Sequence, residues 1–285
     1  MNGARDRAGD RDTDRAAFDD FYGRKWADGP MLWQERYPAD QRVYAVSVYR
    51  RRNEAIMAAL PAKSRAALDV GCGAGDVALM LSRRAPHVVA VDVSAVNVEA
   101  TARNARVAGV RLSPVGTGGE RMPFRDGSFD AVVVADVIEH IDDADAALAE
   151  IYRIMSSGGT MVCVTPLRRT LGAFRAVDWL ARTIARPWRP TLPRFSSDQV
   201  YERFLDKGEL RAMLRRAGFL IERYERICCY PAPETGGALG SLMRRIAARQ
   251  SEERFVVMSD RMIAWLDAAS RLRIFNQKQM WVVRR

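Results

Sequence analysis

A glycine-rich turn is the first feature of the sequence that could do chemistry. The apolar run Ala66–Val70 leads directly into Gly71-Cys72-Gly73-Ala74-Gly75, and a helical pattern follows. Glycines between a strand and a helix permit a tight bend and let a ligand approach the backbone closely. A turn that only packs tightly is the alternative. The strand before it and the helix after it favour ligand binding.

The residue after this turn indicates which ligand it would accept. A dinucleotide-binding fingerprint would need glycine at position 76, but that position is Asp76. A helix N-terminus attracts pyrophosphate through its free N–H groups and its dipole, and a carboxylate there would oppose the phosphate. A nucleoside ligand without phosphate therefore fits better. S-adenosylmethionine, whose adenosine carries a sulfonium and an amino acid, is such a ligand.

A second acidic residue, Asp92, ends the next apolar run. In an open α/β sheet, ligands lie beyond the carboxyl ends of the strands, where this carboxylate can accept hydrogen bonds from both ribose hydroxyls. NAD-binding enzymes share the feature, so it indicates a nucleoside without specifying which one. Capping of the following helix is the alternative role, although Ser94 suits that cap better.

His140 is the candidate for acid–base chemistry. It is one of two histidines and follows the fourth predicted strand, at the edge where a second substrate should arrive. A base there could remove a proton from a hydroxyl group. A structural role in the turn that Glu139 and His140 share is at least as compatible with the sequence. Nearby Asp142 and Asp143 are typical of helix-start charges, and we expect no metal site.

The elements that must position these residues alternate between short apolar runs and helical patterns. Such alternation predicts βα units around a mostly parallel sheet that is buried on both faces. The expected strands are 66–70, 88–93, 110–115, 131–135, 160–165, 219–230 and 279–284, and the expected helices are 42–60, 76–84, 95–108, 144–155 and 207–217. The predicted fold class is α/β, a Rossmann-like seven-stranded sheet with helices on both faces and helical lid or insert segments in the C-terminal half.

Five motifs in order resemble the class I methyltransferases, and within them the branch that includes the ubiquinone-biosynthesis O-methyltransferases. They are Leu68–Gly75, Asp92, Met122–Asp130, Asp136–His140 and Gly158–Thr160. The resemblance covers about residues 50–230. It implies a Rossmann-like domain that binds S-adenosylmethionine and transfers its methyl group. The motifs are specific for the family and not for the methyl acceptor.

Position by position, the resemblance implies contacts with each part of the cofactor. The glycine loop would contact the methionine part, and Asp69 would hold its amino group. Asp92 would bind the ribose, residues 119–120 would border the adenine, and Asp136 would begin the wall beneath the sulfonium. The expected cofactor-binding residues are Asp69, Gly71, Cys72, Gly73, Asp92, Val93, Gly119, Glu120 and Asp136.

The adenine side departs from the family pattern. Relatives usually have Asp-Ala-Glu where this chain has Gly118-Gly119-Glu120. The carboxylate that would accept a hydrogen bond from the adenine amino group is therefore missing. Backbone groups or water must hold the adenine instead.

The chain divides into a core and two additions. Residues 61–165 form the predicted cofactor-binding core, 166–206 an acceptor lid or insert, and 232–276 a C-terminal helical insert, all within one domain over 21–285. The arginine- and aspartate-rich tail 1–20 is expected to be disordered. No apolar run approaches the roughly 20 residues that cross a bilayer. The four cysteines indicate neither a zinc site nor a disulfide scaffold, so we expect a cytoplasmic protein.

Positive charge is concentrated in the second half. Residues 1–150 carry 20 Lys and Arg against 23 Asp and Glu, and residues 151–285 carry 25 against 12, giving net charges of −3 and +13. The basic half indicates an anionic partner or a solvated arginine-rich surface. Apolar helical faces with basic borders predict peripheral contact with an anionic membrane, on its inner face, through 168–189 and 238–250. Lid helices that pack on the domain are the alternative.

The leading hypothesis is methyl transfer to oxygen of a small or lipid-like acceptor. Nucleobase amino-methyltransferases have an Asn/Asp-Pro-Pro-aromatic motif where this chain has Asp136–Glu139, which disfavours nucleic acid without excluding RNA ribose or protein. A nicotinamide-dependent oxidoreductase is a second hypothesis, against which Asp76 argues. A non-catalytic ligand-binding protein is a third. The sequence identifies neither the acceptor nor an oligomeric state.

Overall fold

The computed structural model describes residues 49–167, 205–227 and 278–285, and the backbone of 39–48. It also describes the single residues Ala16, Asp19, Asp20, Arg249, Arg254, Met258 and Arg261. Of the predicted tail, Ala16, Asp19 and Asp20 are helical, and the rest lies outside the described residues. Most of the predicted lid at 166–206 and of the insert at 232–276 also lies outside them.

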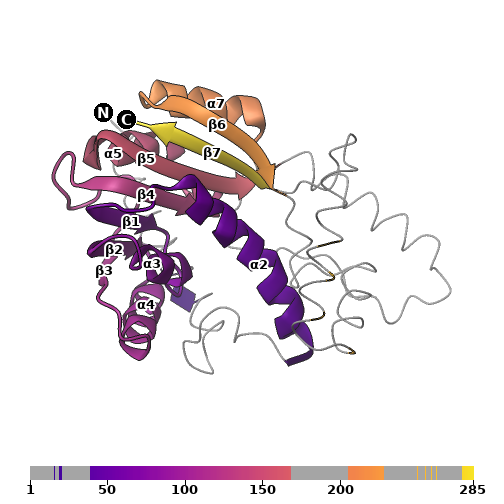
Figure 1. The fold of residues 1–285 in the computed structure, drawn as a ribbon. Coiled ribbons are helices and arrows are strands. Elements are labelled where there is room, and N and C mark those ends of the chain that lie inside the picture. The colour runs from indigo at the N-terminus through magenta and orange to yellow at the C-terminus, as the bar shows by residue number, and fades with distance from the viewer. Residues whose placement is uncertain are drawn as a thin grey trace.

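Seven strands form one sheet in the described part of the chain, with helices on both faces (Figure 1). The strands are β1 (Ala66–Val70), β2 (His87–Asp92), β3 (Ser113–Gly116), β4 (Phe129–Ala135), β5 (Met155–Pro166), β6 (Leu220–Ile227) and β7 (Lys278–Arg284). The helices are α2 (Ala39–Ala59), α3 (Asp76–Leu81), α4 (Ala95–Val107), α5 (Ala144–Ile154) and α7 (Lys207–Arg216), with a 3₁₀ turn, η2 (Ile138–His140). The predicted α/β class, with a seven-stranded mostly parallel sheet and helices on both faces, is confirmed, and the helical lid or insert segments remain a prediction.

The strand order places a ligand crevice beside β1. The order is β3-β2-β1-β4-β5-β7-β6, so the chain adds strands on one side of β1 up to β3 and then crosses to β4 on the other side. Strands β1 to β5 are parallel, and β7 is antiparallel to β5 and β6. In such sheets ligands bind beyond the carboxyl ends of the strands at the switch point, here β1 and β4.

The central strand β4 shows why its sequence is almost continuously apolar. Val132, Val133 and Val134 are all fully buried. Val133 packs in the core that contains Ile56 of α2 and the α3 side chains, whereas its two neighbours pack in the core below α5 and α7. Because side chains alternate across a strand, a strand covered on both faces has no polar positions.

The starts of two strands differ most from the prediction. Strand β3 starts at Ser113 rather than Val110, because Gly109 (φ +65°) closes α4 and the N–H of Val110 donates to the carbonyl of Ala105 at 2.9 Å. Strand β5 starts at Met155 rather than Thr160, because Met155 already pairs with Phe129 before an irregularity in the ladder. Both differences lie away from the ligand edge of the sheet.

Candidate active site

The three loop glycines have different surroundings. Their φ angles are +68°, +55° and +88° for Gly71, Gly73 and Gly75, a region that other residues rarely adopt. A Cβ added to Gly71 would lie 2.3 Å from Cγ2 of Val137, and one added to Gly75 would lie 2.9 Å from Cγ2 of Thr101. A Cβ on Gly73 would meet no atom within 4 Å among the described residues. The loop is therefore packed at both ends and open at its centre.

Two side chains of helix α4 donate hydrogen bonds to the backbone of the glycine loop. The Thr101 hydroxyl donates to the carbonyl of Gly73 at 3.0 Å, and the Asn104 amide donates to that of Ala74 at 2.9 Å. Cys72 lies 3.4 Å from the Thr101 hydroxyl oxygen and is buried. Burial raises the pKa of its thiol well above the ordinary value, so Cys72 is a packing residue and not a thiolate nucleophile.

Asp92 organises the turn between β2 and α4. Its Oδ2 accepts from the backbone N–H of Gly73 at 2.9 Å, and its Oδ1 accepts from the N–H of Ser94 at 3.0 Å and from the Asn97 amide at 3.2 Å. Ser94 caps α4, as expected, and its hydroxyl also donates to Asp19 at 2.6 Å. Burial raises the pKa of Asp92 despite these donors. Asp92 thus lies at the carboxyl end of β2 and holds the glycine loop and the start of α4 in place.

Two buried carboxylate oxygens lack a hydrogen-bond partner in the described part of the chain, Oδ2 of Asp69 and Oδ1 of Asp136. Asp69 is in β1 and Asp136 directly follows β4, so both belong to the strands beside the switch point. Burial raises the pKa of Asp69 to about 7, although the N–H of Ala78 and the charge of Arg52 oppose the shift. An unpaired buried carboxylate oxygen is costly. A ligand carrying cationic N–H donors would satisfy these two.

Asp136 is held by two cations from distant parts of the chain. Its Oδ2 accepts from Nη1 of Arg52 in α2 at 2.7 Å and from Nζ of Lys278 in β7. Its backbone has a φ of +59°, the one positive value among the described non-glycine residues. Burial would raise the pKa of Asp136, but Lys278 and Arg52 outweigh it and hold that pKa below its ordinary value. Asp136 is therefore ionised.

Glu139 lies beneath this ion cluster. Its carboxylate accepts from the Thr165 hydroxyl at 2.9 Å, and its side chain is buried. Burial, reinforced by the negative charge of Asp136, raises the pKa of Glu139 to about 8. Below that pH it is neutral. Glu139 is therefore a buried packing residue next to Asp136, and it adds no negative charge to the site below that pH.

His140 lies in η2, one turn after Asp136. Its backbone N–H donates to the carbonyl of Val137 at 2.8 Å, and its side chain is partly exposed. His140 is therefore part of an ordered turn that follows the carboxyl end of β4.

The predicted adenine side consists of the turn after β3. The N–H of Thr117 donates to the carbonyl of Asp92 at 2.9 Å, which brings this turn beside Val93. A Cβ on Gly119 would lie 2.9 Å from Cδ1 of Ile141, so Gly119 packs closely against the segment after η2. Glu120 is partly exposed and its carboxylate approaches Gly118.

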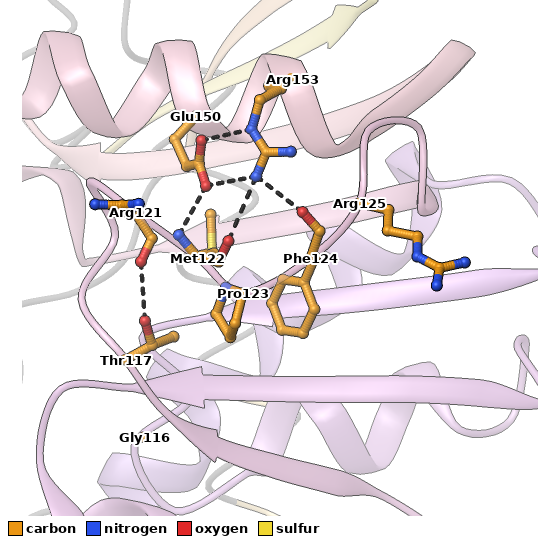
Figure 2. Close-up of a pocket in the computed structure, with 9 residues that line it drawn as sticks. All are labelled: Gly116, Thr117, Arg121, Met122, Pro123, Phe124, Arg125, Glu150 and Arg153. Carbon is orange, nitrogen blue, oxygen red and sulfur yellow. Dashed lines mark hydrogen bonds and ion pairs between the residues drawn. The ribbon is translucent and has the colours of Figure 1, made fainter.

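A pocket of about 790 Å³ adjoins this turn (Figure 2). Glu150 of α5 accepts from the N–H of Met122 at 2.7 Å, and Arg153 donates to the carbonyl of Phe124 at 2.9 Å. Hydrogen bonding to Arg153 lowers the pKa of Glu150. The Glu150–Arg153 pair fixes the course of the chain after β3, whereas Arg125 points away from it.

Comparison with known proteins establishes the family. The sequence model of one protein family, described as a methyltransferase domain, matches residues 68–163. A demethylmenaquinone methyltransferase of Thermus thermophilus is 32% identical over 187 residues, which are 62% of this chain and 83% of that protein. The chain belongs to the S-adenosylmethionine-dependent class I methyltransferases. The methyltransferase also matches a ubiquinone biosynthesis O-methyltransferase of Cereibacter sphaeroides, 28% identical over 57% of this chain and 63% of that protein.

Solved structures share the fold of this methyltransferase. The geranyl diphosphate C-methyltransferase of Streptomyces coelicolor, in complex with S-adenosyl-L-homocysteine, has a TM-score of 0.57 at 16% identity and covers 86% of this chain and 83% of its own. The [4+2]-cyclase SpnF has the same TM-score at 20% identity, and the match covers 91% of this chain and 90% of the cyclase chain. The fold therefore supports more than one kind of reaction, and the chemistry must be argued from the residues.

Two site residues of the methyltransferase, Arg52 and Lys278, were missed by sequence reasoning. They are separated from Asp136 by 84 and 142 positions, and no motif contains them. The one signal available was a lysine directly before the predicted terminal strand. Among the described residues, no three His, Cys, Asp or Glu side chains gather closely enough to hold a metal ion. No helix in the described part of the methyltransferase is long and apolar enough to cross a membrane.

Proposed function

We propose that this enzyme transfers the methyl group of S-adenosylmethionine to an oxygen atom of a small or lipid-like acceptor. The main support for the position of the cofactor is that two buried carboxylate oxygens, Oδ2 of Asp69 and Oδ1 of Asp136, have no hydrogen-bond partner among the described residues. Asp69 lies in β1, which leads into the glycine loop, and Asp136 directly follows the adjacent strand β4. The α-ammonium group of the cofactor's methionine part would donate to them.

The remaining cofactor contacts follow from the loop. The open centre of the loop at Gly73 would accept the methionine part, while Gly71 and Cys72 keep the loop in shape. Asp92 would accept hydrogen bonds from the ribose in addition to those it already accepts, because each carboxylate oxygen has two lone pairs. Val93, Gly119 and Glu120 would border the adenine.

The bound cofactor supplies an activated methyl group on a sulfonium, so the protein mainly supplies alignment. Correct orientation can contribute about 7 to 11 kcal/mol to lowering such a barrier. Asp136 contributes by its position, since it stands between the loop and the expected acceptor. The side chains of Arg52 and Lys278 fix it there.

A hydroxyl acceptor must also lose its proton, and His140 is the proposed base. Its side chain is partly exposed, in the turn that follows the carboxyl end of β4. A positioned base contributes roughly 10² to 10⁴-fold in rate. The buried, neutral Glu139 is unsuited to this role below pH about 8, because it already carries a proton.

Relatives favour a quinone-type acceptor. The matched proteins are named as demethylmenaquinone and ubiquinone-biosynthesis methyltransferases. The set includes a C-methyltransferase of ubiquinone and menaquinone biosynthesis, 28% identical, so transfer to carbon is the second candidate. A base at His140 would serve either reaction, because methylation at oxygen and at ring carbon both release a proton.

The test has two parts. Calorimetry with S-adenosylmethionine should detect binding, and mass spectrometry should detect a product heavier by one methyl group with a quinol or catechol acceptor. Absence of cofactor binding would reject the site. Transfer to ring carbon only would reject oxygen as the acceptor atom.

We also propose peripheral contact with an anionic membrane. The supporting observations are the basic second half and the amphipathic segments 168–189 and 238–250, which lie almost entirely outside the described residues. Each Arg near an anionic surface adds about 1 kcal/mol. Co-sedimentation with vesicles containing phosphatidylglycerol at low salt should retain the enzyme. No binding at low salt would reject the proposal and leave 166–206 and 232–276 as a lid and an insert over an acceptor taken from solution.

A further inference from the structure

In the ion cluster at the carboxyl end of β4, two cations contact the same carboxylate. The two cations are Arg52 and Lys278, and the ionised carboxylate is Asp136. The neighbouring Glu139 adds no negative charge to the cluster, since burial keeps that side chain neutral below pH about 8. All of these side chains are buried or nearly so, and the two cations are 10% and 15% exposed. Arg52 is also close enough to interact electrostatically with Asp69, whereas the carboxylate that Lys278 contacts in the described part of the chain is Asp136.

We propose that Lys278 binds the reacting oxygen of the acceptor as an oxyanion, so that the enzyme selects acidic hydroxyls, such as those of phenols and catechols, over alcohols. This inference rests on the proposed function, because it names the acceptor class of the same site. It goes beyond that function by assigning an acceptor-binding residue outside every motif of the sequence.

The topology places Lys278 where the acceptor should arrive. Strand β7 runs antiparallel to β5, with Lys278 opposite Pro166, so the start of β7 lies at the carboxyl end of β5. The backbone N–H of Asp136 donates to the carbonyl of Val164 at 2.8 Å, which joins the end of β4 to the same edge. The Lys278 ammonium is therefore at the ligand edge of the sheet, two strands beyond β4 on the side away from the glycine loop.

The ammonium group retains donors for a ligand. A lysine side chain has three N–H donors, and in the described part of the chain Asp136 is the one carboxylate that Lys278 contacts. Arg52 shares that carboxylate and continues to hold it when Lys278 turns one donor toward a ligand. An oxyanion would accept a charge-assisted hydrogen bond from this ammonium group, which is stronger than the bond that a neutral alcohol would accept, whereas an ammonium ligand would be repelled.

The chemical step balances without a further reactant. The acceptor hydroxyl loses its proton to the base and then to water, and the resulting oxyanion is stabilised by the Lys278 ammonium. A lone pair of that oxygen forms the new bond to the methyl carbon. The bond from that carbon to sulfur breaks, and its electron pair remains on the sulfur, which becomes a neutral thioether.

The test uses 4-nitrocatechol, whose visible absorption changes when it loses a proton. The full-length protein is saturated with S-adenosyl-L-homocysteine, and the ligand is titrated across pH 5–9. Bound to the wild type, 4-nitrocatechol should ionise at a pH at least one unit lower than it does free in solution. Lys278→Met should abolish this shift and weaken binding at pH 7 by tenfold or more.

Three variants make the result interpretable. Lys63→Met removes an exposed lysine in the turn before β1 and should leave the shift unchanged. Lys278→Arg keeps the charge and the ion pair with Asp136, so it should fold and retain most of the shift. Lys278→Gln provides a second neutral variant if Lys278→Met is unstable, as judged from melting temperature.

The outcomes separate this inference from the proposed function. Equal spectra and equal affinities for the wild type and the neutral variants would overturn the role of Lys278, as would failure of the wild type to bind 4-nitrocatechol. S-adenosyl-L-homocysteine binding, measured separately by calorimetry, tests the cofactor site. If it is intact in the wild type and the variants, only the inference about Lys278 has failed.

Discussion

The carboxylate of Asp92 accepts a hydrogen bond from the backbone N–H of Gly73 at 2.9 Å and so ties the end of β2 to the open centre of the glycine loop. The residue proposed to bind the ribose is thus also the residue that positions the loop for the methionine part. Both halves of the cofactor site depend on one buried side chain.

Asp92→Ala should weaken S-adenosylmethionine binding by at least tenfold. Two hydrogen bonds from the ribose to a charged acceptor would be lost, each worth about 1.5 to 3 kcal/mol, and the loop would lose its tie to β2. Calorimetry measures the affinity, and thermal unfolding measures the accompanying loss of stability.

Asp130→Ala is the matched control for Asp92→Ala. Asp130 accepts from the backbone N–H groups of Arg65 and Ala66 at 2.7 and 3.0 Å, but at the amino end of the sheet. The Asp130→Ala substitution should lower the melting temperature and leave the affinity for S-adenosylmethionine unchanged. Equal losses of affinity in the two variants would remove Asp92 from the cofactor site.

Gly71→Ala and Gly73→Ala should fail in different ways. At Gly71 the new Cβ would overlap Val137, and overpacking costs about 1 to 3 kcal/mol in addition to backbone strain, so melting temperature should fall strongly. At Gly73 the Cβ would enter open space, so the fold should lose only about 1 to 2 kcal/mol of backbone strain while cofactor affinity drops. The reverse pattern would place the ligand elsewhere.

Cofactor affinity should depend on the protonation of Asp69. Burial raises the pKa of Asp69 from 3.8 to about 7, so below pH 7 the free enzyme carries a proton that must leave before the carboxylate can hold an ammonium group. Affinity should therefore be full above pH about 8 and fall by up to tenfold per pH unit below 7. Calorimetry in buffers of different ionisation enthalpy would count the released proton. Asp69→Asn should bind weakly at every pH, and an unchanged slope in that variant would exclude Asp69 as the source.

Glu139→Gln should stabilise the protein at alkaline pH relative to the wild type. Burial raises the pKa of Glu139 from 4.5 to about 8, so the folded state holds its proton more tightly than the unfolded chain. The stability from this group is full below pH 4.5 and is lost as pH rises through 8. The melting temperature of the variant relative to the wild type should rise from pH 5 to pH 8, by about 2–4 °C for each kcal/mol. A difference that is constant across this range would contradict the assigned pKa.

His140→Ala should lower the turnover number by roughly 10² to 10⁴-fold with little change in cofactor affinity. The reason is the loss of the proposed base. Single-turnover kinetics across pH should also lose an inflection that the wild type shows. If turnover survives, His140 has a structural role in η2.

The sequence alone determined the sheet, the glycine loop and the class of cofactor. Those features are local. A few consecutive residues are enough to recognise an apolar strand followed by glycines, or an acidic residue at the end of a strand. The parallel order then follows because alternating strands and helices allow few topologies. Asp76 is also a local signal, because it stands where a dinucleotide-binding fingerprint has glycine. Its presence favoured S-adenosylmethionine over a dinucleotide as the ligand.

Only the tertiary structure decided which groups surround Asp136. Arg52 lies in a leading helix and Lys278 in the last strand, and neither position carries a motif. They meet because α2 packs against β5 and because β7 pairs antiparallel with β5, which brings the first residue of β7 to the carboxyl edge of the sheet. Their charges hold the pKa of the buried Asp136 below its ordinary value. Such a property depends on burial and on contacts between distant segments, and sequence spacing does not record either.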